Sequence, residues 1–394
     1  MILQREPDVS PVGRPMRTRE RPFSLWREDA IAAASGGVLM LGLLLDGWNH
    51  INLQNGALGG FFTPWHGLLY AGFTLSASWV ITRNAHLYRP DRVAKPQFHP
   101  ILGVPLRYPL AMVGIVIASA GVVGDALWHT LFGEETGVAR VIAPFHLLLF
   151  TGAALVLSAP LRSGWHAPET YPPRPSLAQI LPPLCSLTLI TALVAFMFQW
   201  LSAFTDWAPS LQLGHLPAGL ADDPRVRGTV ELAGVARVVV TNLILVAPVL
   251  LALRRWRLPF GSVTVMWTAV AVFMSALTNF RSGGAVLAAG AGGLFTDLLI
   301  ARLNPSPAHP LTLRLLGALT PGVTWSTFFL LTALIHDTPW PGDLWMGTVG
   351  VASMTGIALS FLAVPVAVPE TVLEAGGSDP EFPSPPMPCQ VPIH

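Results

Sequence analysis

Long apolar segments separated by short polar ones run along most of the chain. Ten of them hold about 20 mostly hydrophobic residues, which is the length that an α-helix needs to cross the hydrocarbon core of a bilayer. They cover residues 30–50, 64–82, 108–129, 144–161, 179–203, 229–252, 259–279, 283–301, 315–335 and 344–366. The pattern predicts an all-α polytopic membrane protein of about ten transmembrane helices. The eighth segment is rich in glycine and alanine, which favours close helix packing.

The composition supports a membrane location. Hydrophobic residues make up 52% of the chain and charged residues 11%, with a mean hydropathy of +0.54, whereas soluble domains carry about 25% charged residues. We therefore expect the lipid bilayer as partner, with further membrane subunits left open. A net charge of +1 gives no basic field of the kind that binds nucleic acid. Cys185 and Cys389 lie too far apart in the sequence to form a cysteine-based metal motif.

The distribution of basic residues predicts the orientation. Arginine and lysine are frequent in the N-terminal segment and in alternate loops, while the opposite loops contain only Arg140, Arg225, Arg227 and Arg281. By the positive-inside rule both termini are cytoplasmic, in what we expect to be the inner membrane of a bacterium. The first apolar segment is long enough to span the membrane and is not expected to be a cleavable signal peptide.

This topology divides the chain into four parts. Residues 1–29 are predicted to form a cytoplasmic tail and residues 367–394 a second, proline-rich one. Residues 30–162 form a region of two helical hairpins, and residues 163–366 form the remaining bundle.

Two of the predicted hairpins repeat one another. The first contains LLLDGWNH and then TPWHGLLYAG, and the second contains VVGDALWHTLFG and then APFHLLLFTG. Each has the motif Asp-x3-His, followed after 15 or 16 intervening residues by a second histidine in Pro-[Trp/Phe]-His. Alignment of the two pairs the following residues: Asp46 with Asp125, His50 with His129, Pro64 with Pro144, and His66 with His146. We interpret this as a duplicated helical-hairpin unit.

The spacing brings the polar side chains of each hairpin together. Residues four apart lie on one face of a helix, so Asp46 and His50 point the same way. Pro64 suits the first turn of the returning helix, which places His66 at the same end of the hairpin. Ionisable groups within an apolar span are costly, by about 2.5–3.5 kcal/mol on insertion scales, and commonly mark functional sites. Two imidazoles and one carboxylate per hairpin therefore predict a metal site with open positions, facing outside.

The same residues have simpler interpretations that the sequence leaves open. An Asp–His pair at this spacing can serve only to satisfy both groups in a polar packing network, and it can line a proton or ion pathway. Duplication copies a structural motif as readily as a functional one.

Several other polar or aromatic residues are weaker candidates. Glu134 and Glu135 are candidate ligands or bases, although a solvated loop is the simpler interpretation. Loop and helix-end residues that could cap or join the site are Asp206, His215, Asp222, Asp223, His336 and Asp337. A polar network is expected among Glu231, Arg237, Asn279 and Arg281, and Asp297 is expected to snorkel or to pair locally. The tryptophans Trp48, Trp65, Trp128, Trp200 and Trp207 are expected in the outer aromatic belt, where the first three would also wall the site.

The paired motif resembles a known copper site. Asp46, His50 and His66, with Asp125, His129 and His146, resemble the Asp-x3-His and following His of one membrane subunit (the C subunit) of the particulate methane and ammonia monooxygenases. The resemblance covers these few residues of each hairpin. It implies copper as the metal and the oxidation of small apolar molecules.

The leading hypothesis is thus a membrane metalloprotein with one or two metal centres, a copper-dependent oxidase or monooxygenase of an apolar substrate that enters from the bilayer. Without the resemblance, the ligands fit zinc or iron about as well as copper. The alternatives are a zinc-dependent membrane hydrolase with Glu134 as base, and a non-enzymatic transporter or subunit of a larger complex. No dinucleotide fingerprint is present.

Overall fold

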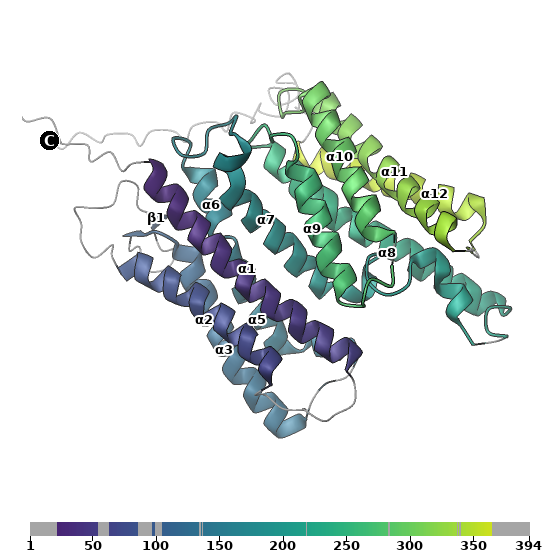
Figure 1. The fold of residues 1–394 in the computed structure, drawn as a ribbon, viewed down its shortest axis with the longest axis horizontal. Helices are drawn as coiled ribbons and strands as arrows, with labels where there is room; N and C mark the ends of the chain where they lie inside the picture. The colour runs from purple at the N-terminus through teal and green to yellow at the C-terminus, as the bar shows by residue number, and fades with distance from the viewer. Residues whose placement is uncertain are drawn as a thin grey trace, which may run out of the picture.

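The computed structural model describes residues 22–53, 63–85, 97–98, 105–133, 135, 137–217, 219–282, 284–336, 338 and 340–364. Most of them lie in α-helices (Figure 1). The helices are α1 (Pro22–Asn52), α2 (Pro64–Ala85), α3 (Pro109–Phe132), α4 (Ala139–Ile142), α5 (Pro144–Leu157), α6 (Ala159–His166), α7 (Leu177–Met197), α8 (Pro224–Leu253), α9 (Ser262–Ala276), α10 (Ala285–Leu303), α11 (Pro310–Ile335) and α12 (Gly342–Ala363). The 3-10 helices are η3 (Gln199–Leu201) and η4 (Pro209–His215), and a small antiparallel pair is formed by β1 (Gln97–Phe98) and β2 (Pro105–Leu106).

All ten predicted segments contain helix, and the fold class is all-α as expected. Within the described residues, eight helices are long and apolar enough to cross a membrane. The other two segments hold α2, which is not among these eight, and α9, which has 15 residues. Ten spans, and the cytoplasmic position of both termini, therefore remain predictions.

Local sequence explains where the predicted helices are shorter than expected. Gly261, with a φ of 91°, precedes α9, and the left-handed backbone of Asn279 and Phe280 closes the turn after it. The fourth segment is divided into α5 and α6 at Ser158, two residues before Pro160, which has no N–H to donate to a carbonyl of the preceding turn.

The first two hairpins are α1 with α2 and α3 with α5, and each pair packs along its length. The contact is close because small residues lie at the crossing: a Cβ added to Gly72 would be 2.5 Å from the Cα of Leu39. The expected close packing of the glycine-rich eighth segment is also present, because a Cβ on Gly293 in α10 would be 2.7 Å from the Cα of Thr264 in α9. Backbones that approach this closely gain dispersion contacts that lipid does not supply.

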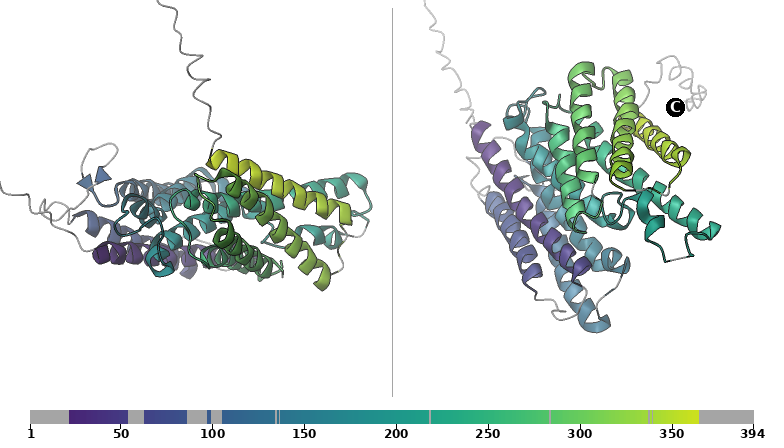
Figure 2. Two further views of the ribbon diagram at one scale, coloured as in Figure 1. Left: turned by 90° about the horizontal axis from the view of Figure 1, so that it is seen from above. Right: turned by 45° about the vertical axis from the view of Figure 1, so that its right-hand side comes forward.

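Helix α7 joins the hairpins to the rest of the bundle, since it packs against α1, α5 and α6 on one side and α8 and α9 on the other. Figure 2 shows the hairpins toward one end of an elongated bundle and α11 and α12 toward the other side of it. One hydrophobic core includes residues from both parts, among them Leu39, Phe150, Phe196 and Trp325. Buried Asn242 in the core is paired: it donates to the carbonyl of Ala352 at 2.9 Å and accepts from the Trp325 indole at 3.2 Å.

Buried Asp29 joins α1 to three other segments at the end where α1 begins. It accepts hydrogen bonds of 2.7 Å from the hydroxyls of Tyr108, Ser163 and Tyr171, and Arg107 lies 3.5 Å away. Burial and the Asp29 carboxylate raise the pKa of Tyr108 and of Tyr171, so both phenols stay protonated and able to donate.

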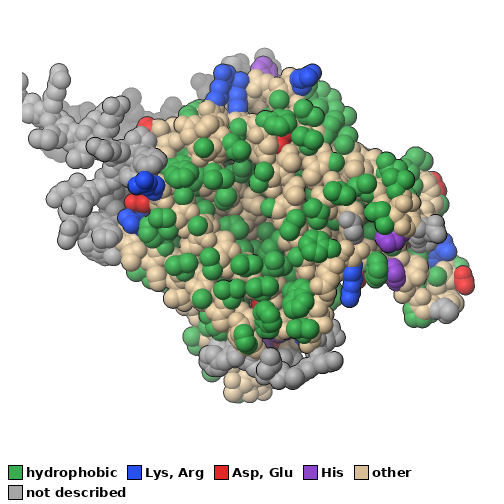
Figure 3. Space-filling view, viewed as in Figure 1, with side chains coloured by type: hydrophobic (Ala, Val, Ile, Leu, Met, Phe, Trp, Pro, Cys, Tyr) green, Lys and Arg blue, Asp and Glu red, His purple; other side chains and the backbone are tan. Residues whose placement is uncertain are grey.

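The surface carries few charges over the middle of the bundle. In Figure 3 hydrophobic side chains are spread over the whole visible face, and most of the visible arginines and acidic residues lie toward its edges. Many large hydrophobic side chains are exposed, including Val116 at 67% and Leu362 at 78%. An exposed apolar surface of this extent, together with the eight apolar helices, fits an integral membrane protein.

Candidate metal centre

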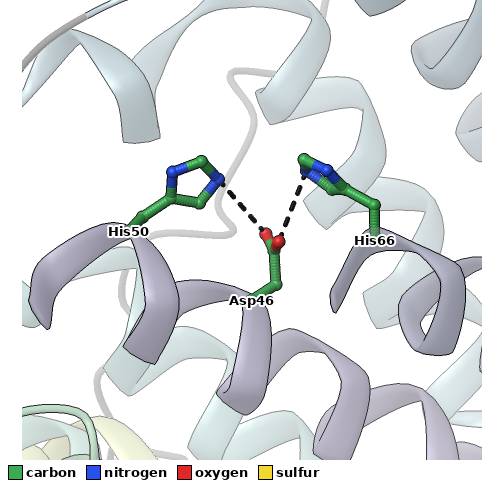
Figure 4. A group of neighbouring side chains, drawn as sticks. All are labelled: Asp46, His50 and His66. Carbon is green, nitrogen blue, oxygen red and sulfur yellow. Dashed lines mark ion pairs between the residues drawn. The ribbon is translucent and has the colours of Figure 1, made fainter. Parts of the chain in front are cut away.

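The first triad is formed within one hairpin. Asp46 and His50 lie one turn apart near the end of α1, and His66 lies in the first turn of α2, which begins at Pro64 as predicted. The Asp46 carboxylate lies between the two imidazoles (Figure 4), 3.8 Å from the Nε2 of His50 and 3.4 Å from that of His66. The three side chains thus converge from two helices on one point.

The second triad has the same construction in the next hairpin. Asp125 and His129 lie one turn apart near the end of α3, and His146 lies in the first turn of α5, which begins at Pro144. The Asp125 carboxylate is 3.4 Å from the Nε2 of His129 and 3.2 Å from that of His146. The chain therefore contains two Asp/His groups that could each bind a metal ion.

The donor atoms suit a metal in both triads. Within each triad they all lie within 4.8 Å of one another. Two ligands bonded at about 2.1 Å in a tetrahedral site are about 3.4 Å apart, which is close to the 3.2–3.8 Å observed between carboxylate and imidazole. The Oδ1 atoms of Asp46 and Asp125 are buried, and the Nε2 atoms of His66 and His146 lie 3.4 Å and 3.2 Å from them. A buried carboxylate oxygen is costly unless a hydrogen bond or a cation balances it.

Thr63 orients the His66 imidazole. Its hydroxyl oxygen accepts the backbone N–H of His66 at 3.2 Å, as in a helix N-cap, and lies 3.0 Å from the Nδ1 of the same residue. A hydroxyl oxygen has two lone pairs, so it can accept from both nitrogens. An Nδ1–H held in this way leaves Nε2, the atom facing Asp46, as the ligand. The ring of Tyr70 stacks on His66 at 5.9 Å between centroids.

Glu135 lies beside the second triad. Its Oε2 is 3.3 Å from the Nε2 of His129, and both carboxylate oxygens are buried without a hydrogen bond from a described residue. Arg140 fixes the loop, because its Nε donates to the Glu135 carbonyl at 3.2 Å and its Nη1 to the His50 carbonyl at 3.4 Å. Arg140 thereby links the two hairpins.

Both triads open into one cavity of about 590 Å³. Glu135, Arg140, Thr63 and Tyr70 line it together with the six triad residues. The rest of its wall is largely apolar and comes from α1, α2, α3, α5 and α7; it includes Met40, Leu69, Phe73, Ala118, Val122, Leu149, Phe150, Leu193 and Phe196. The cavity therefore combines a cluster of acidic groups and imidazoles with hydrophobic walls.

The other loop candidates do not join this cavity. Asp206 pairs with Arg281 at 3.3 Å, His215 stacks on Trp207 at 3.9 Å, and Asp223 accepts from the backbone N–H of Arg225 at the start of α8. Asp222 and His336 are exposed. Glu134 and Asp337 lie outside the described residues.

The expected polar network has other partners than predicted. Glu231 pairs with Arg227 at 4.0 Å, and Asn279 bonds to Trp48 and Asn52 rather than to Glu231 or Arg237. Asp297, expected to snorkel or to pair locally, is buried and pairs with another helix: its carboxylate accepts the backbone N–H groups of Val263 and Thr264 at the start of α9.

The tryptophan prediction needs correction. Trp48, Trp65 and Trp128 do not wall the cavity: Trp48 bonds to Asn279 and packs edge-on against Trp65, and Trp128 packs against Phe132 and Phe145. Trp200 lines the cavity instead. Trp48 lies two residues after Asp46, and Trp128 lies one residue before His129, so each indole points to a different face of its helix from that triad residue.

Sequence reasoning missed Thr63, Tyr70 and Arg140. Thr63 had a local signal, because a threonine before Pro64 at a helix start is a typical N-cap. Tyr70 lies four residues after His66, on the same helix face, which is a second such signal. Arg140 had no signal in the local sequence, since its contact with His50 joins different hairpins.

Comparison of the chain with protein-family models, with curated proteins and with solved structures found no match.

Proposed function

We propose that this protein is a membrane-embedded metalloenzyme that uses two metal centres, one in each hairpin, to oxidise an apolar substrate. Asp46, His50 and His66 would hold one ion; Asp125, His129 and His146 would hold the other. The centres would face the outside of the cell, as the positive-inside rule predicts for this end of the hairpins.

One observation carries this proposal: both triads open into the same cavity, and most of the remaining wall is hydrophobic. A polar packing network needs no such space, and a transport site is expected near the middle of the membrane between broken helices. A pocket with apolar walls and a few convergent polar groups is the usual form of a small-molecule site.

The ligand set limits which metals can bind but does not determine a single one. Two imidazoles and one carboxylate suit copper, zinc and iron. We propose copper because of the resemblance to the particulate monooxygenases. A bound copper ion would supply one-electron redox chemistry, which these side chains do not provide.

The residues of the chain would bind and orient the reactants. Leu69, Phe73 and Phe196 would hold an apolar substrate in the hydrophobic part of the cavity and exclude water from it. Thr63 would keep the Nε2 of His66 directed at the metal. Three protein ligands leave positions open for an exogenous ligand.

The proposed reaction needs an external reductant. Insertion of one atom of dioxygen into a C–H bond reduces the other atom to water and consumes two electrons and two protons. We therefore include an electron-donating partner, such as another membrane subunit, in the proposal.

Metal analysis of the detergent-purified protein is the first test. We expect near-stoichiometric copper in the native protein and its loss from the double variant His50→Ala/His129→Ala. The matched control is His309→Ala/His336→Ala, which removes two exposed histidines outside the cavity and should keep the metal. A native protein that binds no metal after loading with Cu²⁺, Zn²⁺ or Fe²⁺ would overturn the proposal.

A zinc-dependent hydrolase is the second candidate. Its support is the Glu135 carboxylate, which lines the cavity and accepts no hydrogen bond from a described residue, as a general base acting on zinc-activated water would require. Stoichiometric zinc in the purified protein, with ester hydrolysis that survives replacement of zinc by other redox-inactive ions, would favour it over the oxidase.

A further inference from the structure

We infer that the two metal centres are unlike: Glu135 joins Asp125, His129 and His146 in a four-ligand centre, while Asp46, His50 and His66 form a three-ligand centre with open positions. This inference rests on the proposed function, since it requires that both triads bind metal.

Glu135 contacts the second triad through His129. Its carboxylate is not among the donor atoms that all lie within 4.8 Å of one another, and a rotation of its side chain would bring it to the ion. Its Oε2 is 3.3 Å from the Nε2 of His129, and the Oδ1 of Asp125 is 3.4 Å from the same nitrogen. Both values match the roughly 3.4 Å expected between neighbouring ligands of a tetrahedral ion. The Glu135 side chain is 13% exposed, and neither oxygen accepts a hydrogen bond from a described residue. A buried carboxylate of this kind requires a positive partner.

Arg140 holds Glu135 at this position without neutralising its carboxylate. The guanidinium donates to the backbone carbonyls of Glu135 and His50, so its hydrogen bonds fix the loop rather than the acid group. The side chain of Glu135 remains directed into the cavity that both triads line.

The first hairpin has no equivalent carboxylate. Its connection, residues 51–65, reads INLQNGALGGFFTPW and contains no Asp, Glu or His. Whatever conformation this loop adopts, it cannot supply a fourth acidic or imidazole ligand to Asp46, His50 and His66. The difference between the centres is therefore already present in the amino-acid sequence.

The ligand sets differ in charge and openness. A divalent ion with two carboxylates and two imidazoles forms a neutral centre, whereas one carboxylate and two imidazoles leave a net charge of about +1. Four protein ligands are typical of closed, structural ions, and three of catalytic ions. The Glu135 centre should thus bind a divalent ion more tightly and load first, and the Asp46 centre should be the one that exogenous ligands reach.

Titration of the metal-free full-length protein in detergent with Co²⁺ tests the inference, because the visible absorption of Co²⁺ reports coordination number. We expect two ions per native chain, bound in two steps. His66→Ala should abolish the weaker step. In the His66→Ala background, Glu135→Gln should lower the Co²⁺ affinity of the remaining centre by at least about tenfold and should change its absorption spectrum. A tenfold loss is already seen when only an outer partner of a metal ligand is removed.

Glu134→Gln in the same background is the matched control, since it removes a neighbouring carboxylate of the same loop; it should keep the affinity and spectrum of His66→Ala alone. Equal affinity and spectra for the Glu135→Gln and Glu134→Gln proteins would overturn the inference and leave two equal centres. Native protein that binds no Co²⁺, Cu²⁺ or Zn²⁺ would overturn the proposed function as well. Size-exclusion chromatography of each variant separates a lost ligand from a lost fold.

Discussion

At the scale of single residues, Thr63 shows how one side chain can serve both folding and binding. Its hydroxyl caps the first turn of α2 and also contacts the Nδ1 of His66. The corresponding residue of the second hairpin is Ala143, which makes no side-chain cap for α5. The two triads therefore differ in how the second histidine is oriented, in addition to the difference made by Glu135.

Replacement of Thr63 should weaken the first centre alone. We expect Thr63→Val to lower its Co²⁺ affinity by about tenfold or more, because the His66 ring loses the partner that fixes its tautomer and direction. Thr63→Ser retains a hydroxyl and should keep near-native affinity. Titrations that resolve the two binding steps measure the Co²⁺ affinity of each centre. An equal loss of affinity at both centres would contradict a role specific to His66.

At the scale of the helices, the contact between α1 and α2 lies directly beneath the first triad. Gly42 is one turn before Asp46, and a Cβ there would be 2.6 Å from the Cα of Leu69, which follows His66 by three residues. The distance between Asp46 and His66 thus depends on the absence of a side chain at position 42.

Gly42→Ala should separate these two helices. We expect it to destabilise the protein by about 1–3 kcal/mol, as overpacking commonly does, and to weaken metal binding at the first centre more than at the second. Gly37→Ala is the control on the same helix, because its Cβ would meet nothing within 4 Å; it should be neutral or stabilising by up to about 1 kcal/mol. Unfolding in mixed detergent micelles measures the stability of both variants. Similar losses of stability for the two variants would refute the packing argument.

Asp29 links α1 to other elements at the opposite end of the hairpins. Asp29→Ala would leave the hydroxyls of Tyr108, Ser163 and Tyr171 without their acceptor and would remove one of the two carboxylates beside Arg107, the other being Glu28. We expect a loss of about 3 kcal/mol or more in the free energy of unfolding, as for removal of one member of a buried ion pair.

The control for this substitution is Asp343→Ala, which removes an exposed carboxylate from the first turn of α12 and should cost at most about 1 kcal/mol. Metal stoichiometry should survive both changes, because the triads lie at the other end of α1. An Asp29→Ala protein as stable as Asp343→Ala would show that the network contributes little.

At the scale of the whole molecule, the arrangement of helices makes a prediction about the two membrane faces. The triads lie at the ends of α1 and α3 and in the first turns of α2 and α5. The loop before α8 should lie on that same face, whereas the loop between α10 and α11 should lie on the other. Site-directed labelling tests this after Cys185 and Cys389 are replaced by serine.

A membrane-impermeant maleimide added to intact cells should label Asp222→Cys and leave Ala308→Cys unlabelled until the membrane is opened. Both positions are exposed, so accessibility to water, rather than burial, decides the result. The reverse pattern would place the metal centres on the cytoplasmic side, and labelling of both in intact cells would contradict the topology.

The sequence by itself determined the helices and the composition of each triad. Apolar length specifies a helix in a bilayer because every backbone polar group must be satisfied within its own segment. Asp46 with His50 follows from the 3.6-residue period, and a proline at the first position of α2 places His66 within the same few residues of the hairpin end. These relations are local, so they could be predicted without knowledge of the packing.

Only the tertiary structure decided which groups share a site. Contacts of α2 with α3 and of α1 with α5 bring the two hairpins together around one cavity, and Arg140 holds Glu135 in it, while the Trp48, Trp65 and Trp128 side chains lie outside. Contacts between helices depend on side-chain shape across residues distant in the chain. The periodicity of a single segment carries no information on that shape, which is why the sequence left open whether the two triads face the same space.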